Sequence, residues 1–159
     1  MLFRSALVPT WTSQGTLLDL GGLYFGSVTP EEQKKFFYMH LYYSRVETEA
    51  LRQALNDTPD RSRDELSTVR NVVFGQARIF PALGSHFEPV QQAEIDREVQ
   101  AYQAYSNSFS RDEALKRPIT YAIIPAAKEF DFTNLDRWYE RDAGERVGAY
   151  TLYRLKLRD

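Results

Sequence analysis

The sequence contains no cysteine and only two histidines, His40 and His86. The lack of cysteine excludes disulfide bonds, thiolate catalysis and cysteine-ligated zinc. Neither histidine has a second one at helical spacing with a carboxylate nearby, which is the arrangement that metal-binding helices use. Gly21-Gly22 is followed by no glycine-rich phosphate-binding pattern and is typical of a tight turn. We therefore predict no metal and no cofactor.

The sequence also lacks long apolar runs. No stretch of about 18 apolar residues is present, so no transmembrane helix is predicted. The segment from Met1 to Pro9 lacks the apolar centre of a signal peptide. Leu2-Phe3-Arg4-Ser5 is what a widely used sequencing adapter encodes in one reading frame. We hypothesise that residues 1–5 are an assembly artefact and that the true chain continues upstream, with a genuine polar N-terminus as the alternative.

The sequence also lacks a large excess of charge of either sign. The formal net charge is −2 and the sequence pI is about 5.8, which argues against a nucleic-acid partner because such partners need a clustered basic face. With 159 residues and 43% hydrophobic residues, the chain is typical of a single soluble domain, residues 1–159. Ten Tyr, ten Phe and two Trp form either a ring-filled core or a surface on which a ligand stacks.

The last forty residues predict a strand, a short helix and a second strand. The β-rich run 119–124 lies between Pro118 and Pro125, and residues 133–141 predict one or two helical turns. From Val147 to Leu157 the residues alternate in polarity, which predicts a strand that neighbours the first one. One face of this strand is expected to hold Val147, Ala149, Thr151, Tyr153, Leu155 and Leu157, and the other Arg154 and Lys156.

Helices are predicted upstream of this unit. Thr29, Pro30 and Glu32 form a helix start with a capping box, and a second helix continues the first or restarts near Thr48. We expect the helix from Pro30 to cover one sheet face through Phe36, Tyr43 and Ala50. Another helix carries Ile95, Val99 and Tyr102 on one side, and a capping box at 110–113 begins a short one. The predicted fold class is α+β with α/β character: a sheet of three to five strands flanked by three or four helices, with a C-terminal strand-helix-strand unit.

Carboxylate pairs are the remaining candidates for chemistry. Asp131 with Asp136 or Glu140 would need one carboxyl group in an apolar pocket and the other ionised. Asp136 is better explained by its position in the first turn of a helix after Thr133, and Glu140 as a surface group near Arg137 and Arg141. Glu94 and Glu98 are expected to be solubilising charges on an exposed helix face. We therefore predict no catalytic residue in this chain.

The end and the front of the chain resemble a known family. The final pattern consists of residues 119–124, Asp131, residues 135–140, Gly148 and residues 151–154. The front pattern consists of residues 8–15, residues 26–32, Phe36-Phe37-Tyr38 and Leu41-Tyr42-Tyr43. Together they resemble the C-terminal extracytoplasmic domain of bacterial polytopic membrane proteins of the GT-C glycosyltransferase type, similar to mannosyltransferases that use dolichyl- or polyprenyl-phosphate sugars. The absence of membrane helices departs from that family.

The resemblance implies a non-catalytic domain with a structural or acceptor-recognition role, on the extracytoplasmic (periplasmic) side of the inner or plasma membrane. Catalysis would belong to a transmembrane region upstream, which would also be the domain's partner, together with a glycan or lipid-linked sugar. Candidate ligand or interface contacts are an aromatic rim of Tyr42, Tyr43, Trp138 and Tyr139, with core packing of these rings as the alternative. The alternative function is a free-standing soluble interaction module without catalytic activity.

Overall fold

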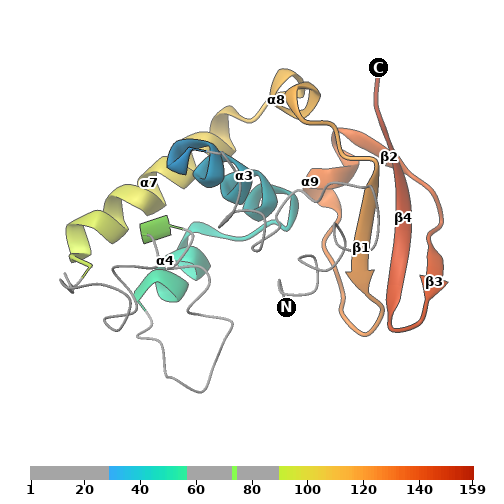
Figure 1. Ribbon diagram of the computed structural model, residues 1–159, viewed down its shortest axis with the longest axis horizontal. Helices are drawn as coiled ribbons and strands as arrows, with labels where there is room; N and C mark the ends of the chain where they lie inside the picture. The colour runs from blue at the N-terminus through green and yellow to red at the C-terminus, as the bar shows by residue number, and fades with distance from the viewer. Residues whose placement is uncertain (1–28, 57–72, 75–89) are drawn as a thin grey trace. The chain divides into compact units, whose positions relative to one another are not determined.

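The computed structural model describes residues 29–56, 73–74 and 90–159. Expectations for residues 1–28 and for His86 lie outside these residues. The described part has five helices and a four-stranded antiparallel sheet, which confirms the α+β class (Figure 1). The helices are α3 (Pro30–Tyr43), α4 (Thr48–Asn56), α7 (Gln92–Ser108), α8 (Arg111–Lys116) and α9 (Thr133–Asp136), and the strands are β1 (Tyr121–Pro125), β2 (Tyr139–Arg141), β3 (Glu145–Val147) and β4 (Tyr150–Leu157).

The chain divides into two compact units. The first comprises Met1–His40 and Glu47–Tyr105, and the second Leu41–Val46 and Ser106–Asp159. We describe each unit by itself. The expectation of one domain over residues 1–159 stays a prediction.

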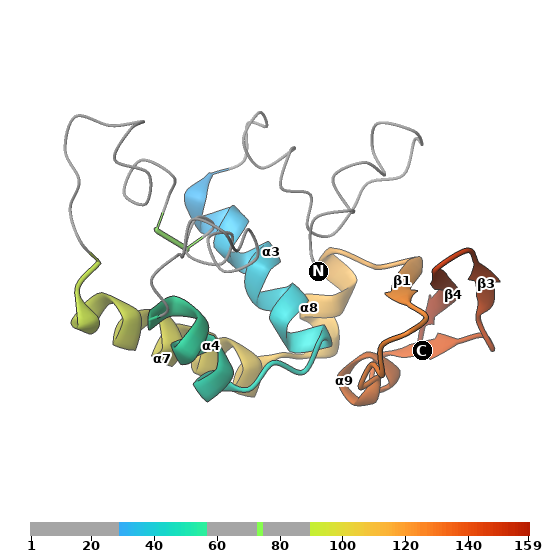
Figure 2. The same ribbon diagram turned by 90° about the horizontal axis from the view of Figure 1, so that it is seen from below.

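The first unit is built on α3, α4 and α7. The predicted capping box is confirmed: Glu32 N–H donates to the Thr29 hydroxyl oxygen (3.3 Å), and Thr29 N–H donates to the Glu32 carboxylate (3.0 Å). The predicted face of α7 is buried through Ile95, Val99 and Tyr102. The buried residues of α4 are Leu51 and Leu55. An ion pair between Arg52 and Asp96 joins α4 to α7, which lie side by side in both views (Figures 1 and 2).

A Schellman cap ends α3 and lies within the second unit. Arg45 N–H donates to the Tyr42 carbonyl and Val46 N–H to the Leu41 carbonyl, both at 3.0 Å. Arg45 has φ 50°, the left-handed conformation that this cap requires and that glycine adopts most easily. The chain restarts as α4 at Thr48, as one of the two predicted alternatives had it.

The break between α3 and α4 shows that Phe36, Tyr43 and Ala50 do not form one helix face, as was expected. Phe36 is half-buried and Tyr43 buried, but Ala50 is exposed, because it belongs to a second helix whose direction is set after the cap.

Strand β4 is the centre of the sheet in the second unit. It pairs antiparallel with β1, β2 and β3 (Figures 1 and 2). Because β1 and β3 both face residues 150–152 of β4, they lie on opposite edges of it. The prediction that the strand at residues 119–124 neighbours the last strand of the chain is confirmed, because β1 pairs with β4. Strands β1 and β2 run parallel to each other with β4 between them, so β1, α9 and β2 form a split β-α-β crossover.

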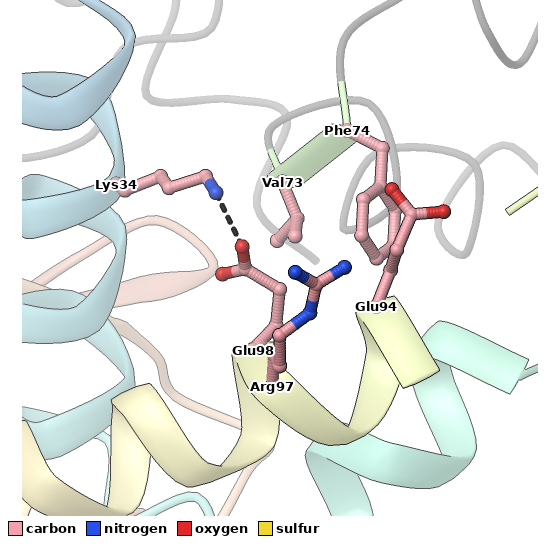
Figure 3. Close-up of a pocket in the computed structure, with 6 residues that line it drawn as sticks. All are labelled: Lys34, Val73, Phe74, Glu94, Arg97 and Glu98. Carbon is pink, nitrogen blue, oxygen red and sulfur yellow. Dashed lines mark hydrogen bonds and ion pairs between the residues drawn. The ribbon is translucent and has the colours of Figure 1, made fainter. Parts of the chain in front are cut away.

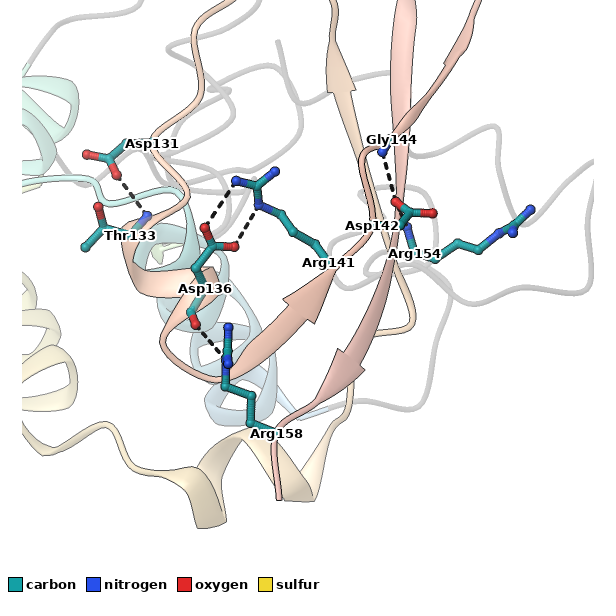
Figure 4. Close-up of polar contacts among 8 residues, drawn as sticks. All are labelled: Asp131, Thr133, Asp136, Arg141, Asp142, Gly144, Arg154 and Arg158. Atoms are coloured by element: carbon teal, nitrogen blue, oxygen red, sulfur yellow. Dashed lines mark hydrogen bonds and ion pairs between the residues drawn. The ribbon is translucent and has the colours of Figure 1, made fainter.

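Strands β2 and β3 form one interrupted strand with a bulge. Arg141 faces Leu155 and Glu145 faces Leu152, so the three residues 142–144 face only the two residues 153–154. The extra residue is accommodated at Gly144, which has φ 79°. The Asp142 carboxylate oxygen Oδ1 accepts hydrogen bonds from the N–H groups of Gly144 and Arg154, each at 3.0 Å (Figure 4). Asp142 therefore replaces the ladder contact that the bulge removes.

The hairpin turn between β3 and β4 corrects the predicted long strand. Val147 pairs with Tyr150, which leaves a two-residue turn at Gly148 and Ala149. A positive φ of 60° at Gly148 alone matches a type II′ turn. The strand therefore begins at Tyr150, and Val147 lies on the Tyr150 face rather than on the Thr151 face.

Candidate functional site

The four aromatic candidates all lie in the second unit, but three of them are core residues. Tyr42, Tyr43 and Tyr139 are 3%, 4% and 0% exposed, and Trp138 is half-buried. Tyr42 stacks on Phe109 with 3.9 Å between ring centroids. The structure thus gives these three rings the core role that the sequence left open, and whether any of the four meets a ligand stays a prediction.

Hydrogen bonds fix the orientation of these rings. The Trp138 indole N–H donates to the Tyr42 hydroxyl oxygen (2.9 Å), and Ile119 N–H donates to the Tyr139 hydroxyl oxygen (3.1 Å). The Arg137 guanidinium lies 4.8 Å from the Trp138 ring centroid. Buried tyrosine and tryptophan need such partners for their polar atoms. Trp138 is therefore the one candidate ring that combines a fixed orientation with remaining exposure.

The carboxylates considered for catalysis are bound to neighbouring groups. Asp131 accepts a hydrogen bond from Thr133 N–H (2.9 Å), as Figure 4 shows. It also forms an ion pair with Arg45. Hydrogen bonds from the Thr133 side chain and backbone, and from Arg45, lower the pKa of Asp131 to about 2. Asp131 is therefore ionised at neutral pH and joins the α3 cap to the start of α9.

Asp136 and Glu140 have different arginine partners. Asp136 accepts a hydrogen bond from Arg141 Nε (2.7 Å) and one from its Nη2 (3.2 Å), which is a bidentate contact (Figure 4). The Arg141 guanidinium also lies 4.1 Å from the Phe132 ring centroid. Glu140 lies 3.7 Å from Arg158 Nη1 rather than beside Arg137 or Arg141 as expected. These contacts stabilise the β2 end of the crossover.

One face of the sheet carries exposed apolar side chains that the sequence analysis did not single out. Tyr121, Ile123 and Val147 are 44%, 50% and 54% exposed. Residues paired directly across an antiparallel sheet share a face, so the pairing of Ile123 with Leu152 and of Val147 with Tyr150 places all of them on this face. We call Tyr121, Ile123, Val147, Tyr150 and Leu152 the outer face of the sheet; the same pairing places the charged residues Glu145 and Arg154 beside them. All five residues of β1 are apolar, so the strand carries apolar side chains on both faces, and this run was taken only as the sign of a sheet strand.

A pocket of about 340 Å³ lies in the first unit (Figure 3). It is lined by Lys34 of α3, by Glu94, Arg97 and Glu98 of α7, and by Val73 and Phe74. Spacing of three and four residues places the three α7 side chains on one side of that helix. The pocket therefore combines two cationic side chains, two carboxylates and an apolar wall.

Glu98 is the most enclosed charge in this pocket. Its side chain is 16% exposed, it forms an ion pair with Lys34, and it accepts a hydrogen bond from the Tyr38 hydroxyl group (2.6 Å). Burial, with this hydrogen bond and the charge of Glu98, raises the pKa of Tyr38, so the phenol stays protonated as a donor. This corrects the expectation that Glu98 is a solvated charge, because α3 packs over this side of α7.

Residues 29–56, 73–74 and 90–159 contain no cluster of three metal-ligating side chains. Within the same ranges, no helix has the length and apolar character needed to cross a membrane. Comparison with known protein families, with curated proteins and with solved structures found no match to this chain.

Proposed function

We propose that this chain is a non-catalytic domain with a structural or acceptor-recognition role, carried on the extracytoplasmic side of a membrane protein of the GT-C glycosyltransferase type. The sequence resemblance described above suggests the parent protein. The structural observation that supports a contact role is the outer face of the sheet, where Tyr121, Ile123 and Val147 are each about half exposed. Apolar side chains gathered on one surface favour a binding partner.

The contacts of the carboxylates support a structural rather than a chemical role for the second unit. Asp131 is held by Arg45 and Thr133, Asp136 by Arg141, and Asp142 by two backbone N–H groups. A general acid at neutral pH needs a raised pKa, whereas Asp131 has a lowered one. Each of these side chains joins two segments of the fold.

We further propose that the outer face contacts the parent protein's own transmembrane region. Contact within one polypeptide needs less buried area than association of separate proteins, because the linker supplies a high effective concentration. The outer face comprises five residues, whereas each partner in a stable complex contributes about 20–30 residues. A tethered partner therefore suits this face better than a free one.

A photo-crosslinking residue at Ile123 or Val147, in the protein expressed from its source gene in intact membranes, tests this proposal. Crosslinks from both positions to segments upstream in the same polypeptide are expected. The control position is Lys128, an exposed residue in the turn after β1, where no crosslink is expected. Crosslinks of equal yield at all three positions, or none at Ile123 and Val147, would contradict the proposed contact.

The alternative is a free-standing interaction module whose outer face binds another protein. The same exposed residues favour it, so the discriminating observation is genetic. Reading the source locus upstream of Met1 reveals whether the frame continues into apolar segments of about 20 residues. An in-frame stop codon just upstream, followed by a ribosome-binding site, would favour the module and remove the membrane parent.

The proposal that the recognised acceptor is a glycan or lipid-linked sugar depends on Trp138, the half-exposed ring among the aromatic candidates. Sugars stack on such rings through their apolar faces. Titration with a mannose oligosaccharide, followed by NMR chemical shifts, tests this in the wild type and in a Trp138→Phe variant. An identical response in both proteins would exclude Trp138 as the contact.

A further inference from the structure

We propose that the pocket of the first unit binds a small monocarboxylate with an attached apolar group, and that Arg97 is the residue that recognises the carboxylate. This site is independent of the function proposed above, because it lies in the other compact unit and uses other residues. The inference rests on how the charges of the pocket are already paired.

Three of the four charged side chains in the pocket have contacts that occupy them. Lys34 and Glu98 form an ion pair with each other, and Tyr38 binds the second carboxylate oxygen of Glu98 (2.6 Å). Glu94 accepts a hydrogen bond from Gln91 N–H (3.0 Å) at the start of α7. These contacts neutralise Glu98 and give Glu94 a capping role.

Arg97 differs from these residues. Its Nε donates to the Ala93 carbonyl one turn earlier (3.2 Å). Arg97 is exposed, and this bond orients its side chain, while its terminal nitrogens have no hydrogen bond to any other residue in the ranges that the structure describes. Figure 3 shows the guanidinium directed towards Val73 and Phe74. Two parallel N–H donors on a planar group match the two oxygens of a carboxylate.

The other side chains that line the pocket determine which group attached to the carboxylate fits. Val73 is buried and Phe74 half-buried, and together they form the apolar wall of the pocket. Two carboxylates and two cations leave the pocket without net charge, so a single negative charge is accepted more readily than the double charge of phosphate. A pocket of about 340 Å³ has room for a ring-sized group beside the carboxylate.

Benzoate is the probe, followed by NMR chemical shifts of the whole chain, and neutral benzamide is its matched control. With about nine non-hydrogen atoms, benzoate should bind with a Kd in the millimolar range. Arg97→Gln should weaken binding by about tenfold or more, since a charge-assisted bidentate contact is lost. Lys35→Gln removes the same charge from an exposed position next to Lys34 and should leave binding unchanged.

A second variant changes affinity in the opposite direction. Glu98→Gln removes the negative charge paired with Lys34, leaves the pocket with a net charge of +1 and should tighten benzoate binding several-fold. Circular dichroism checks that each variant is folded. The proposal is overturned if benzamide or phosphate binds as well as benzoate, if Arg97→Gln binds like the wild type, or if benzoate does not saturate at several times the expected Kd.

Discussion

Replacing Gly144 with alanine tests whether the bulge determines the stability of the β-hairpin. A Cβ atom at this position would lie 2.5 Å from Cε1 of Tyr153 and 2.8 Å from Cγ2 of Thr151. Real Cβ atoms do not approach other atoms this closely, so the Tyr153 ring must move. That ring is not free to do so without loss, since it packs against Phe132 with 5.0 Å between centroids.

Two costs add at Gly144. A φ of 79° costs about 1 kcal/mol for a residue with a Cβ atom. Overpacking against Tyr153 and Thr151 adds about 1–3 kcal/mol, so Gly144→Ala should lower the free energy of unfolding by ~2–4 kcal/mol. Gly148→Ala is the matched control, because it has φ 60° but no atom within 4 Å of the new Cβ. It should cost only about 1 kcal/mol.

Urea unfolding followed by tryptophan fluorescence and by far-ultraviolet circular dichroism measures both losses. In a Tyr153→Ala background the ring is gone, so the cost of Gly144→Ala should fall towards that of Gly148→Ala. Equal losses at Gly144 and Gly148 in the wild-type background, or an unchanged cost without the Tyr153 ring, would refute the assignment of the clash.

Three further predictions concern single residues. Arg45→Gly should be more stable to urea than Arg45→Ala by about 1 kcal/mol, because both lose the Asp131 ion pair but only glycine relieves the positive φ; equal stabilities would contradict this. Asp142→Ala should cost about 1–2 kcal/mol in the same assay by leaving two N–H groups without an acceptor, whereas Asp142→Asn keeps Oδ1 and should cost much less. Burial lowers the pKa of His40 from about 6.5 to about 4. Below pH 6.5 the unfolded chain therefore binds a proton at His40 that the folded chain does not, so the free energy of unfolding should fall as the pH drops from about 6.5 to 4. Because His40 keeps part of its surface exposed, the loss of unfolding free energy is below the ~3 kcal/mol that the full pKa shift would give. An equally steep decline of stability with pH in His40→Asn would exclude this histidine as the cause.

Local sequence signals predicted the elements whose contacts lie close in the chain. Thr29 and Glu32 are three residues apart, and their capping bonds formed as expected. Strand β4 alternates between apolar and charged residues from Tyr153 to Leu157, which is how a strand with one covered face is recognised. The start of α8 at Ser110 was predicted correctly, although the Ser110 side chain forms no capping bond.

Elements without an apolar face were missed. Most of residues 139–147 are charged, and all but Tyr139 and Gly144 are exposed. No alternation of apolar and polar residues therefore marks β2 or β3 in the sequence. The turn at Gly148 was overlooked because Val147 and Ala149 continue the two-residue period of β4 by chance. A two-residue turn reverses the face on which Val147 lies, and only the pairing with Tyr150 reveals it.

The role of the aromatic candidates depends on contacts between distant segments. Tyr42 and Tyr43 are neighbours on a helix and point in different directions, yet both are buried, because Phe109, Trp138 and Tyr139 surround the end of α3 within the second unit. These partners are more than 60 residues away in sequence. Aromatic identity alone therefore did not separate core rings from rim rings.

The position of β4 has a consequence for biosynthesis. It is the last of the four strands in sequence, and each of the other three pairs with it. On the ribosome, the nascent chain therefore carries β1, β2 and β3 without a sheet partner until residues 150–157 have left the exit tunnel. A nonsense codon before Tyr150 would leave Tyr139 and the residues around it without their sheet, so such products should be degraded by cellular proteases rather than accumulate.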